Sequence, residues 1–442
     1  MIESLAGPRD ALDERTKALA GVEQSTVPYA HQTALVNRML DEIGALTRDG
    51  EGITRETYGA GEENAIQAIE QYAAELGFAA ERDRFQNLWL RLPLDHRTEP
   101  PVVIGSHMDS VPQGGNFDGL AGVLAGMLVL DRLRDDPTQA PPVRVLALRA
   151  EESAWFGKAY IGSLALLGKL PASALALRHR SGQGTLGEAM QRSGVDVDAL
   201  ARGEALLAPA DIAGYLELHI EQGPVMVARG WPATVVTGIR GNIRHNRVRC
   251  LGETGHSGAV PRWLRKDAML AVADLLSRLD EHWRVLLQMG MDLVMTTGMC
   301  STPARSHAVS VIPGEVEFSF EVRSQSVDTL ERFYQLMQDE CKAVEKSRGV
   351  RFEFDGLIRS EPAAMDPAWI SRIEAAGETL GAPVERLPSG AGHDAAVFAN
   401  AGVPSAMVFV RNEHGSHNVH EAMEVADFMQ GVDLLHTALI AR

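Results

Sequence analysis

The sequence predicts an α/β fold: a mixed, mostly parallel sheet covered by helices, with a smaller α+β domain inserted into it. Short β-branched runs alternate along the chain with longer amphipathic stretches, which is the pattern of α/β architectures. Residues 101–104 (PVVI) and 143–148 (VRVLAL) read as buried strands, and residues 118–133 between them read as a helix, so that together they form one strand–helix–strand unit. The remaining elements expected in this domain are a helix over 62–76 and strands over 215–220 and 405–410.

The pattern changes from about Trp231, where strands begin to alternate with polar positions. Such alternation is typical of a sheet with one solvated face, and it predicts a separate small domain. Its expected elements are strands at 235–236, 294–297 and 316–322, and helices at 267–279 and 329–346. Helical patterns at 370–380 and 425–439 indicate that the chain then returns to the first domain. The predicted division is therefore residues 1–231 and 359–442 for the catalytic domain and 232–358 for the inserted domain.

Composition excludes several classes of protein. The 442 residues are 45% hydrophobic and 23% charged, which is the balance of a globular chain and not of a disordered one. A net charge of −17 argues against nucleic acid or an anionic membrane as a partner. The uncharged apolar stretch at 119–130 is too short to span a bilayer, and residues 1–10 lack the features of a secretory signal. Three widely spaced cysteines without a Cys-x-x-Cys pair predict reduced thiols and a cytoplasmic location.

Potential metal ligands follow four of the predicted strands, and the carboxyl ends of parallel strands meet at one edge of a sheet. Each has an ordinary explanation when taken alone: an aspartate can cap a helix, a pair of glutamates can be solvated, and a histidine can be structural. These explanations do not account for acids and imidazoles gathering at one edge. The residues are His107, Asp109, Asp118, Glu151, Glu152, His219 and His417.

Imidazole and carboxylate groups in this combination predict a site for two divalent metal ions per subunit, Zn²⁺ or Mn²⁺, with Co²⁺ or Ni²⁺ as alternatives. Two adjacent cations need a shared anionic ligand, and Asp118 is the expected bridge. One cation would then take His107 and His219, and the other Glu152 and His417. We expect Asp109 to accept a hydrogen bond from the second ring nitrogen of His107.

Glu151 is left as a free carboxylate beside this site. In that position it can take a proton from water and deliver it to a departing nitrogen, which predicts hydrolysis of a carbonyl–nitrogen bond. Neither a Gly-x-Ser-x-Gly elbow nor a phosphate-binding glycine loop competes with this interpretation.

Several segments resemble the N-carbamoyl-L-amino-acid hydrolase and allantoate amidohydrolase (hydantoinase/carbamoylase) family, which is related to aminoacylases and carboxypeptidase-G-like metallopeptidases. The resemblance extends from about Leu40 to the C-terminus. It implies the same five metal ligands, Glu151 as the base, and a homodimer whose inserted domain mediates dimerisation and closes over the site. The motifs that carry it are GSHMDSVPQGGNFDGLAGVLAG, AEES, ELHIEQGP, VIPGEVEFSFEVRS, SGAGHDA and GSHNVHE.

The resemblance also implies roles for residues that contact the substrate. Gln222 would touch the substrate, and Arg323 would bind its carboxylate through a guanidinium fork. His256 would reach across the dimer to the reacting carbonyl oxygen and stabilise the developing negative charge. His393 would shape the carboxylate pocket. Without the resemblance, His256 reads as a turn residue and Arg323 as an exposed ion-pairing residue.

The chain departs from the family at three positions. Ser310 stands where the family has a substrate-contacting Asn, Trp155 where an Arg is common, and His420 in a turn where Pro is common. Serine lacks the two amide donors, and Trp155 would add apolar bulk near the site. These changes predict a less polar or bulkier substrate.

The expected function is therefore a dinuclear-metal amidohydrolase that acts on a small molecule, an N-carbamoyl-L-amino acid or a similar ureido or amide compound. One alternative is an N-acyl-amino-acid deacylase or dipeptidase that uses the same site, which would release no ammonia. A second alternative is a non-catalytic metal-binding homologue, and the complete ligand set together with Glu151 argues against it.

Overall fold

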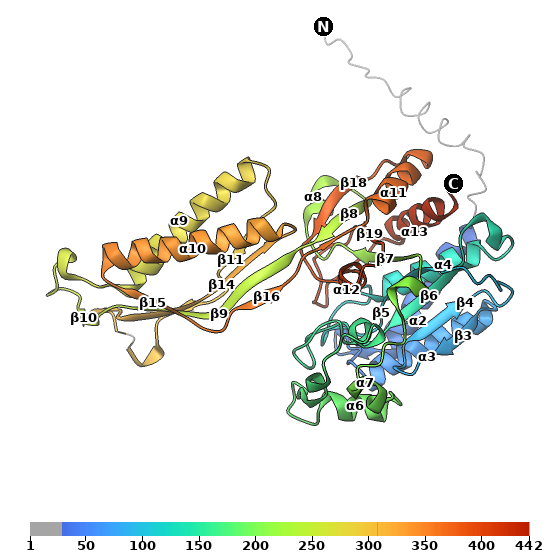
Figure 1. Cartoon of the computed structure of the whole chain (residues 1–442), viewed down its shortest axis with the longest axis horizontal. Coiled ribbons are helices and arrows are strands. Elements are labelled where there is room, and N and C mark those ends of the chain that lie inside the picture. The colour runs from blue at the N-terminus through green and yellow to red at the C-terminus, as the bar shows by residue number, and fades with distance from the viewer. Residues whose placement is uncertain (1–28, 307, 442) are drawn as a thin grey trace, which may run out of the picture.

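The structure is a computed structural model, and it describes residues 29–306 and 308–441. Residues 1–10, which lack the features of a secretory signal, lie outside the described ranges. The described chain forms a large body around a nine-stranded sheet and a small body around a six-stranded sheet, and the two are joined by long strands (Figure 1).

Four parallel strands form the centre of the large sheet, in the order β6 (Val143–Leu148), β5 (Val102–His107), β7 (Gly214–Ile220) and β19 (Ser405–Val410). All are almost wholly buried, which explains their continuous apolar sequences. Their carboxyl ends lie at one edge, where the predicted ligands follow. The outer strands are β3 (Ala79–Arg82), β4 (Leu88–Arg91), β8 (Ala233–Ile239), β17 (Ala363–Ala364) and β18 (Glu385–Ser389).

Helices cover both faces of this sheet, as the alternating side chains of β7 demonstrate. Tyr215 stacks on Phe398 of α12 (Asp394–Asn400) with ring centroids 4.0 Å apart. Leu218 lies against Gly431 of α13 (Val425–Ile440), where a Cβ atom would come within 2.6 Å of the leucine. The other helices of the large body are α2 (Ala30–Leu46), α3 (Ala60–Glu75), α4 (Leu120–Arg132), α5 (Ile161–Leu166), α6 (Leu186–Arg192), α7 (Val197–Ala201), α8 (Val225–Arg229) and α11 (Pro367–Thr379).

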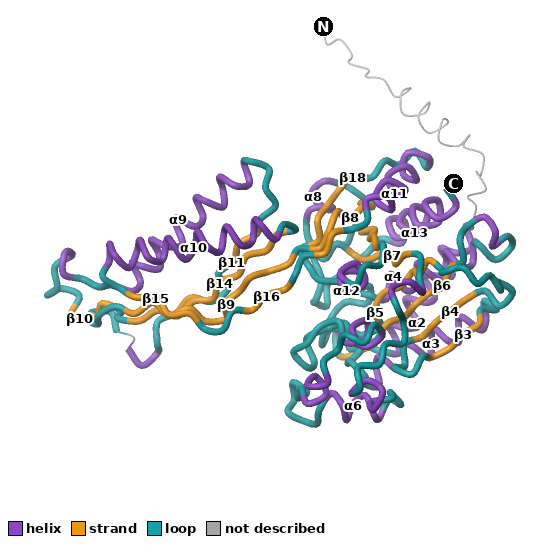
Figure 2. Tube along the Cα trace, in the orientation of Figure 1, coloured by secondary structure: helices purple, strands orange, loops and turns teal. Residues whose placement is uncertain are grey.

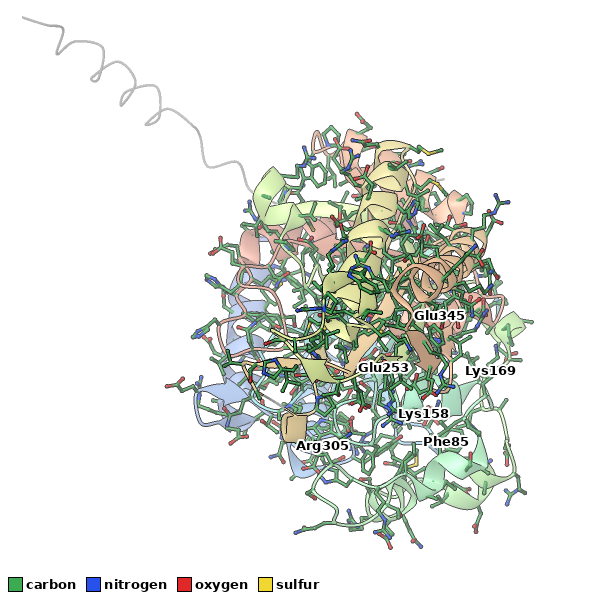
Figure 3. All side chains as sticks on the ribbon, turned by 90° about the vertical axis from the view of Figure 1, so that its left-hand side faces the viewer. Phe85, Lys158, Lys169, Glu253, Arg305 and Glu345 are labelled. Atoms are coloured by element: carbon green, nitrogen blue, oxygen red, sulfur yellow. The ribbon has the colours of Figure 1, made fainter. Side chains whose placement is uncertain are left out.

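The small body is an antiparallel sheet with two long helices, α9 (Ala268–Gln288) and α10 (Val327–Arg348), on one face (Figures 1 and 2). Its central strands are β9 (Gly241–Leu251) and β14 (Glu315–Ser324), and β14 alternates strictly between buried and partly exposed residues. Figure 3 looks along the molecule from the end of this body, where Glu253 and Arg305 lie. The shorter strands are β11 (Val294–Thr296), β12 (Cys300–Ser301), β15 (Arg351–Phe354) and β16 (Ile358–Ser360), with β10 (Gly255–His256) and β13 (Val311–Ile312) as a separate pair.

The predicted α/β class is confirmed, but the sequence analysis missed β9, the strand on which the small sheet is centred. Apolar and polar residues do not alternate regularly along β9, because the inward-facing residue His245 is polar. The ring nitrogens of His245 are 2.9 Å from Asp355 and 2.9 Å from Tyr334. The register between β9 and β14 also shifts nearby. The division into domains stays a prediction. Because β8 pairs within the large sheet, we propose Arg240, between β8 and β9, as the point where the chain first crosses between the bodies.

The cysteines carry no disulfide: Cys250 and Cys341 are buried thiols and Cys300 is exposed. Within the described ranges, none of the helices has the combination of length and apolar character that a membrane span requires.

Candidate metal centre and active site

Five predicted ligands meet at the carboxyl edge of the large sheet, and Asp118 lies between the other four. Its Oδ1 atom is 3.3 Å from His107 Nε2 and 3.1 Å from His219 Nε2. Its Oδ2 atom is 3.5 Å from His417 Nε2, which is itself 3.3 Å from Glu152 Oε1. One carboxylate thus presents one oxygen to each of two ligand groups.

The donor set fits divalent cations. In each of the two groups, His107–Asp118–His219 and Asp118–Glu152–His417, three potential ligand atoms lie within 4.8 Å of one another. The Nδ1 atom of His107 is 3.0 Å from the Asp109 carbonyl oxygen, and that of His219 is 2.9 Å from the Ile220 carbonyl oxygen. Donation from Nδ1 to these carbonyls leaves the Nε2 lone pairs facing Asp118, as a cation requires.

Asp109 lies against the second ring nitrogen of His107, as predicted, and also holds the backbone of the neighbouring glutamates. The His107 Nδ1 atom is 3.4 Å from the Asp109 carboxylate and 3.0 Å from the Asp109 carbonyl oxygen. The carboxylate also accepts hydrogen bonds from the backbone N–H groups of Glu151 (2.9 Å) and Glu152 (3.1 Å) and from the Thr57 hydroxyl (2.5 Å). Asp109 therefore fixes the backbone that carries both glutamates.

The backbone at the site adopts conformations that side chains rarely accept. Ala150, Gln222 and His417 have φ angles of 60°, 62° and 61°. Such left-handed residues cluster at functional sites because the surrounding structure holds them there. Gly119 is also left-handed, with φ of 69°, and a Cβ atom at that position would lie 2.5 Å from the His107 ring. The close approach of α4 to His107 thus requires glycine.

The electrostatics of the cluster favour bound positive charge. Asp118 is buried, yet the imidazoles of His219, His107 and His417 hold its pKa well below the usual range. Hydrogen bonds with Asp118 and Glu152 raise the pKa of His417 to about 10. Burial, reinforced by Glu152, raises the pKa of Glu151 well above its ordinary value. The raised pKa of His417 reflects the two carboxylates beside it, which would equally attract a cation.

A cavity of about 640 Å³ opens over this cluster. Its lining includes Glu151, Tyr160 and Gln222 beside the ligands, with Arg240 and Arg323 on the wall. The Gln222 Nε2 atom donates to Asp118 Oδ2 at 2.7 Å, while its Oε1 atom is buried without a hydrogen-bond partner among the described residues. Gln222 therefore contacts a ligand carboxylate directly and retains a free acceptor.

Arg323 lies on the cavity wall, where its side chain is 31% exposed. It donates to the Gly390 carbonyl oxygen at 2.9 Å and to Glu321 at 3.0 Å. His393 is buried below the cavity and is not part of its lining; its Nε2 atom is 2.9 Å from the Ser389 hydroxyl, and its ring packs against that of His219 at 4.4 Å. His393 thus lies where it can shape the site but not touch a ligand in the cavity.

His256 and Ser310 lie together at the far end of the small body, away from the cavity of their own chain (Figure 1). His256 is exposed and pairs with Val311, and the Ser257 N–H donates to the Ser310 carbonyl oxygen at 2.9 Å. A role for either residue in the reaction requires a second copy of the chain, as the resemblance implies for His256. Both roles stay predictions.

The apolar bulk expected from Trp155 is not in the cavity. The indole is buried, stacks on His179 at 5.6 Å and donates to the Ser110 carbonyl oxygen at 2.8 Å. His420 is exposed and also lies outside the cavity lining. Neither side chain therefore adds apolar bulk to the cavity, and the expected less polar or bulkier substrate stays a prediction.

Two buried residues that the sequence analysis missed hold the loop that carries Asp118. Arg55 donates to the carbonyl oxygens of Met108 (2.8 Å) and Asp118 (3.1 Å), and Glu421 accepts from the N–H of Asp118 (3.2 Å). Arg55 had no strand-end position that could have indicated it, whereas Glu421 lies in the same motif as His417. Both position Asp118 through its backbone.

The model of the peptidase family M20/M25/M40 matches residues 103–441. This chain belongs to that family. It also belongs to its hydantoinase/carbamoylase group, and the predicted class of enzyme, a hydrolase of carbon–nitrogen bonds in linear amides, is confirmed.

Three relatives represent the similarity. The chain is 33% identical to an N-carbamoyl-L-amino acid amidohydrolase of Geobacillus stearothermophilus, over 90% of this chain and 94% of that protein. It is 31% identical to an allantoate amidohydrolase of Escherichia coli, over 87% of this chain and 91% of that protein. A crystal structure of an amidase of the hydantoinase/carbamoylase family from Burkholderia multivorans has a TM-score of 0.82 and 28% identity, covering 92% of this chain and 97% of that one.

Proposed function

We propose that this family member is a dinuclear-metal amidohydrolase that cleaves the carbonyl–nitrogen bond of an N-carbamoyl-L-amino acid or a similar ureido or amide compound. The observation that carries the proposal is the division of the Asp118 carboxylate between two ligand groups, in the same cavity as the buried Glu151. The names of the relatives indicate carbamoyl and ureido substrates.

The five residues that would hold two divalent ions, Zn²⁺ or Mn²⁺, are His107, Asp118, Glu152, His219 and His417. When bound, such ions supply positive charge that polarises a carbonyl group and makes water easier to deprotonate. Carboxylate and imidazole donors suit both ions, so the donor chemistry supports the class of metal and not one element.

Glu151 performs the proton transfers. Its carboxylate, buried at the cavity beside the ligand Glu152, accepts a proton from the attacking water and returns it to the departing nitrogen. Gln222 Oε1, which has no partner among the described residues, accepts a hydrogen bond from the ureido or amide N–H of the substrate. Arg323 binds the substrate carboxylate from the cavity wall.

A homodimer completes the site in this proposal. The exposed His256 at the far end of the small body enters the cavity of the second subunit and donates a hydrogen bond to the carbonyl oxygen as negative charge develops there. The free thiols support a cytoplasmic location.

The decisive experiment is a screen of N-carbamoyl-L-amino acids, N-acetyl-L-amino acids, dipeptides and ureido acids with the Mn²⁺- or Zn²⁺-loaded protein. Released ammonia and released amine are measured separately. Cleavage of a carbamoyl or ureido substrate yields ammonia as well as the amine, and this is the expected result. Amine without ammonia would replace the proposal with a deacylase or dipeptidase, which membership in a peptidase family makes the second candidate.

A further inference from the structure

A second guanidinium faces the cavity beside Arg323. Arg240 lies between β8 and β9, where the chain crosses from the large sheet to the small one, and it lines the same cavity. Because Ser324 pairs with Gly241 and Arg323 with Asn242, Arg240, directly before β9, lies near Arg323 at the base of the small body. Arg240 is in none of the motifs that predicted the site.

Only one side of the Arg240 guanidinium is engaged by protein. Its Nε atom is 2.9 Å and 3.1 Å from the two carboxylate oxygens of Asp292, and its Nη2 atom is 2.6 Å from one of them. The Nη1 atom has no hydrogen-bond partner among the described residues. It lies beside Gly390, and a Cβ atom added to that glycine would be 3.5 Å from Nη1. Arg323 donates to the carbonyl oxygen of this same glycine.

A guanidinium presents its donors in a rigid fork, so one side can hold Asp292 while the other binds an anion in the cavity. The Arg240 side chain is 17% exposed and that of Asp292 is 24% exposed, so a bound ligand would exclude much of the water that remains around the pair. Charge-assisted hydrogen bonds strengthen when water is excluded. The wall thus carries two cationic groups, whereas a neutral amino acid derivative offers a single carboxylate.

We propose that Arg240 is a specificity-determining residue that binds a second carboxylate, so that the preferred substrate is the derivative of an acidic amino acid. Arg323 binds the α-carboxylate and Arg240 binds the side-chain carboxylate. The inference rests on the proposed function and names the substrate class of that same site. It replaces the less polar substrate that the sequence predicted.

The test compares N-carbamoyl-L-glutamate with N-carbamoyl-L-glutamine, which differ at a single functional group, using the Mn²⁺-loaded enzyme. We expect kcat/KM to favour the glutamate derivative by about 10- to 100-fold, with the difference in KM. Arg240→Gln removes the preference. Asp292→Asn is the matched control, because it leaves the guanidinium in place and removes the negative charge of its partner, so the preference persists or grows.

Two outcomes overturn the inference. One is a wild-type enzyme that does not discriminate between the two compounds. The other is an equal loss on both substrates in Arg240→Gln and in Asp292→Asn, which would assign Arg240 to a structural ion pair.

A binding measurement separates this failure from failure of the proposed function. Calorimetry with metal-loaded Glu151→Gln protein compares the affinities of the same two compounds without turnover. Tighter binding of N-carbamoyl-L-glutamate supports Arg240 as an anion-binding residue even where the wild type cleaves neither compound. Equal affinities contradict the inference whatever the activity.

Discussion

The two sheets of this protein contribute opposite charges to one cavity. The large sheet concentrates acids and imidazoles at the buried carboxyl ends of parallel strands, with Asp118 at the centre. The small sheet contributes the partly exposed Arg323, and Arg240 lies at its junction with the large one. The proposed metal ligands thus lie at the edge of a core packed on both faces, and the two arginines proposed to bind substrate carboxylates lie on or beside the small body.

The largest effect should follow from removing the charge that joins the two ligand groups. Asp118→Asn keeps the shape of the side chain but not its anionic character, so adjacent cations lose their shared ligand. We expect metal content, measured by mass spectrometry after desalting, to fall from about two ions per chain to one or fewer, and turnover to fall below detection. Asp366→Asn, at the N-cap of α11, is the matched control because Asn caps a helix equally well. Retention of both ions in Asp118→Asn would contradict the bridging role.

The next largest effect tests whether the large body alone performs proton transfer. Glu151→Gln should lower kcat by about 10²- to 10⁴-fold, because an amide cannot accept the proton. The metal content should be unchanged, since Glu151 is not among the predicted ligands. Equal rates for variant and wild type would remove Glu151 from the mechanism.

A third prediction asks whether the small body of one chain serves the large body of another. His256→Ala should lower kcat by about 10²- to 10³-fold. Co-expressed His256→Ala and Glu151→Gln chains should recover about a quarter of wild-type activity, because half of the dimers are mixed and each of these has one complete site. If His256 acted within its own chain, the mixture would recover nothing.

The smallest effect concerns the pH dependence of stability, which is compared for one histidine in each body. Burial, with the charge of Arg132, lowers the pKa of His436 in α13 to about 4. A histidine with a lowered folded-state pKa contributes stability that is present above about pH 6.5 and is lost as the pH falls towards 4. In urea titrations, the unfolding free energy of the wild type should therefore fall by about 1–2 kcal/mol more than that of His436→Phe between pH 7 and pH 4.5, allowing for partial exposure. His282→Phe on α9 of the small body is the control, and an equal change there would contradict the assignment.

The strands that could be predicted from the sequence are those whose two faces are both buried. The strands β5, β6, β7 and β19 are buried on both faces, so their apolar runs are continuous and the polar residues that follow them are conspicuous. It failed at β9, because an inward histidine with two partners, His245, looks like an exposed residue in the sequence.

The direction in which a side chain points after a turn could not be predicted from the sequence either. Trp155 follows the left-handed Ala150 and the two glutamates, and its indole turns into a cluster with His179 and not into the cavity. Arg55 and Glu421 reach Asp118 from distant loops, and such long-range contacts depend on tertiary packing that no local pattern encodes. The chemistry of the site was thus more predictable than the residues that support it.

Gly119 shows how little room this centre leaves for change. A Cβ atom at this position would lie only 2.5 Å from the His107 imidazole. Even Gly119→Ala would therefore displace His107, which lies on another element. An engineer who wishes to alter metal preference should therefore leave the α4 junction untouched and vary the loop around His417, whose ring is half open to solvent. The position of the His107 ring depends here on a residue without a side chain as much as on the groups that surround the ring.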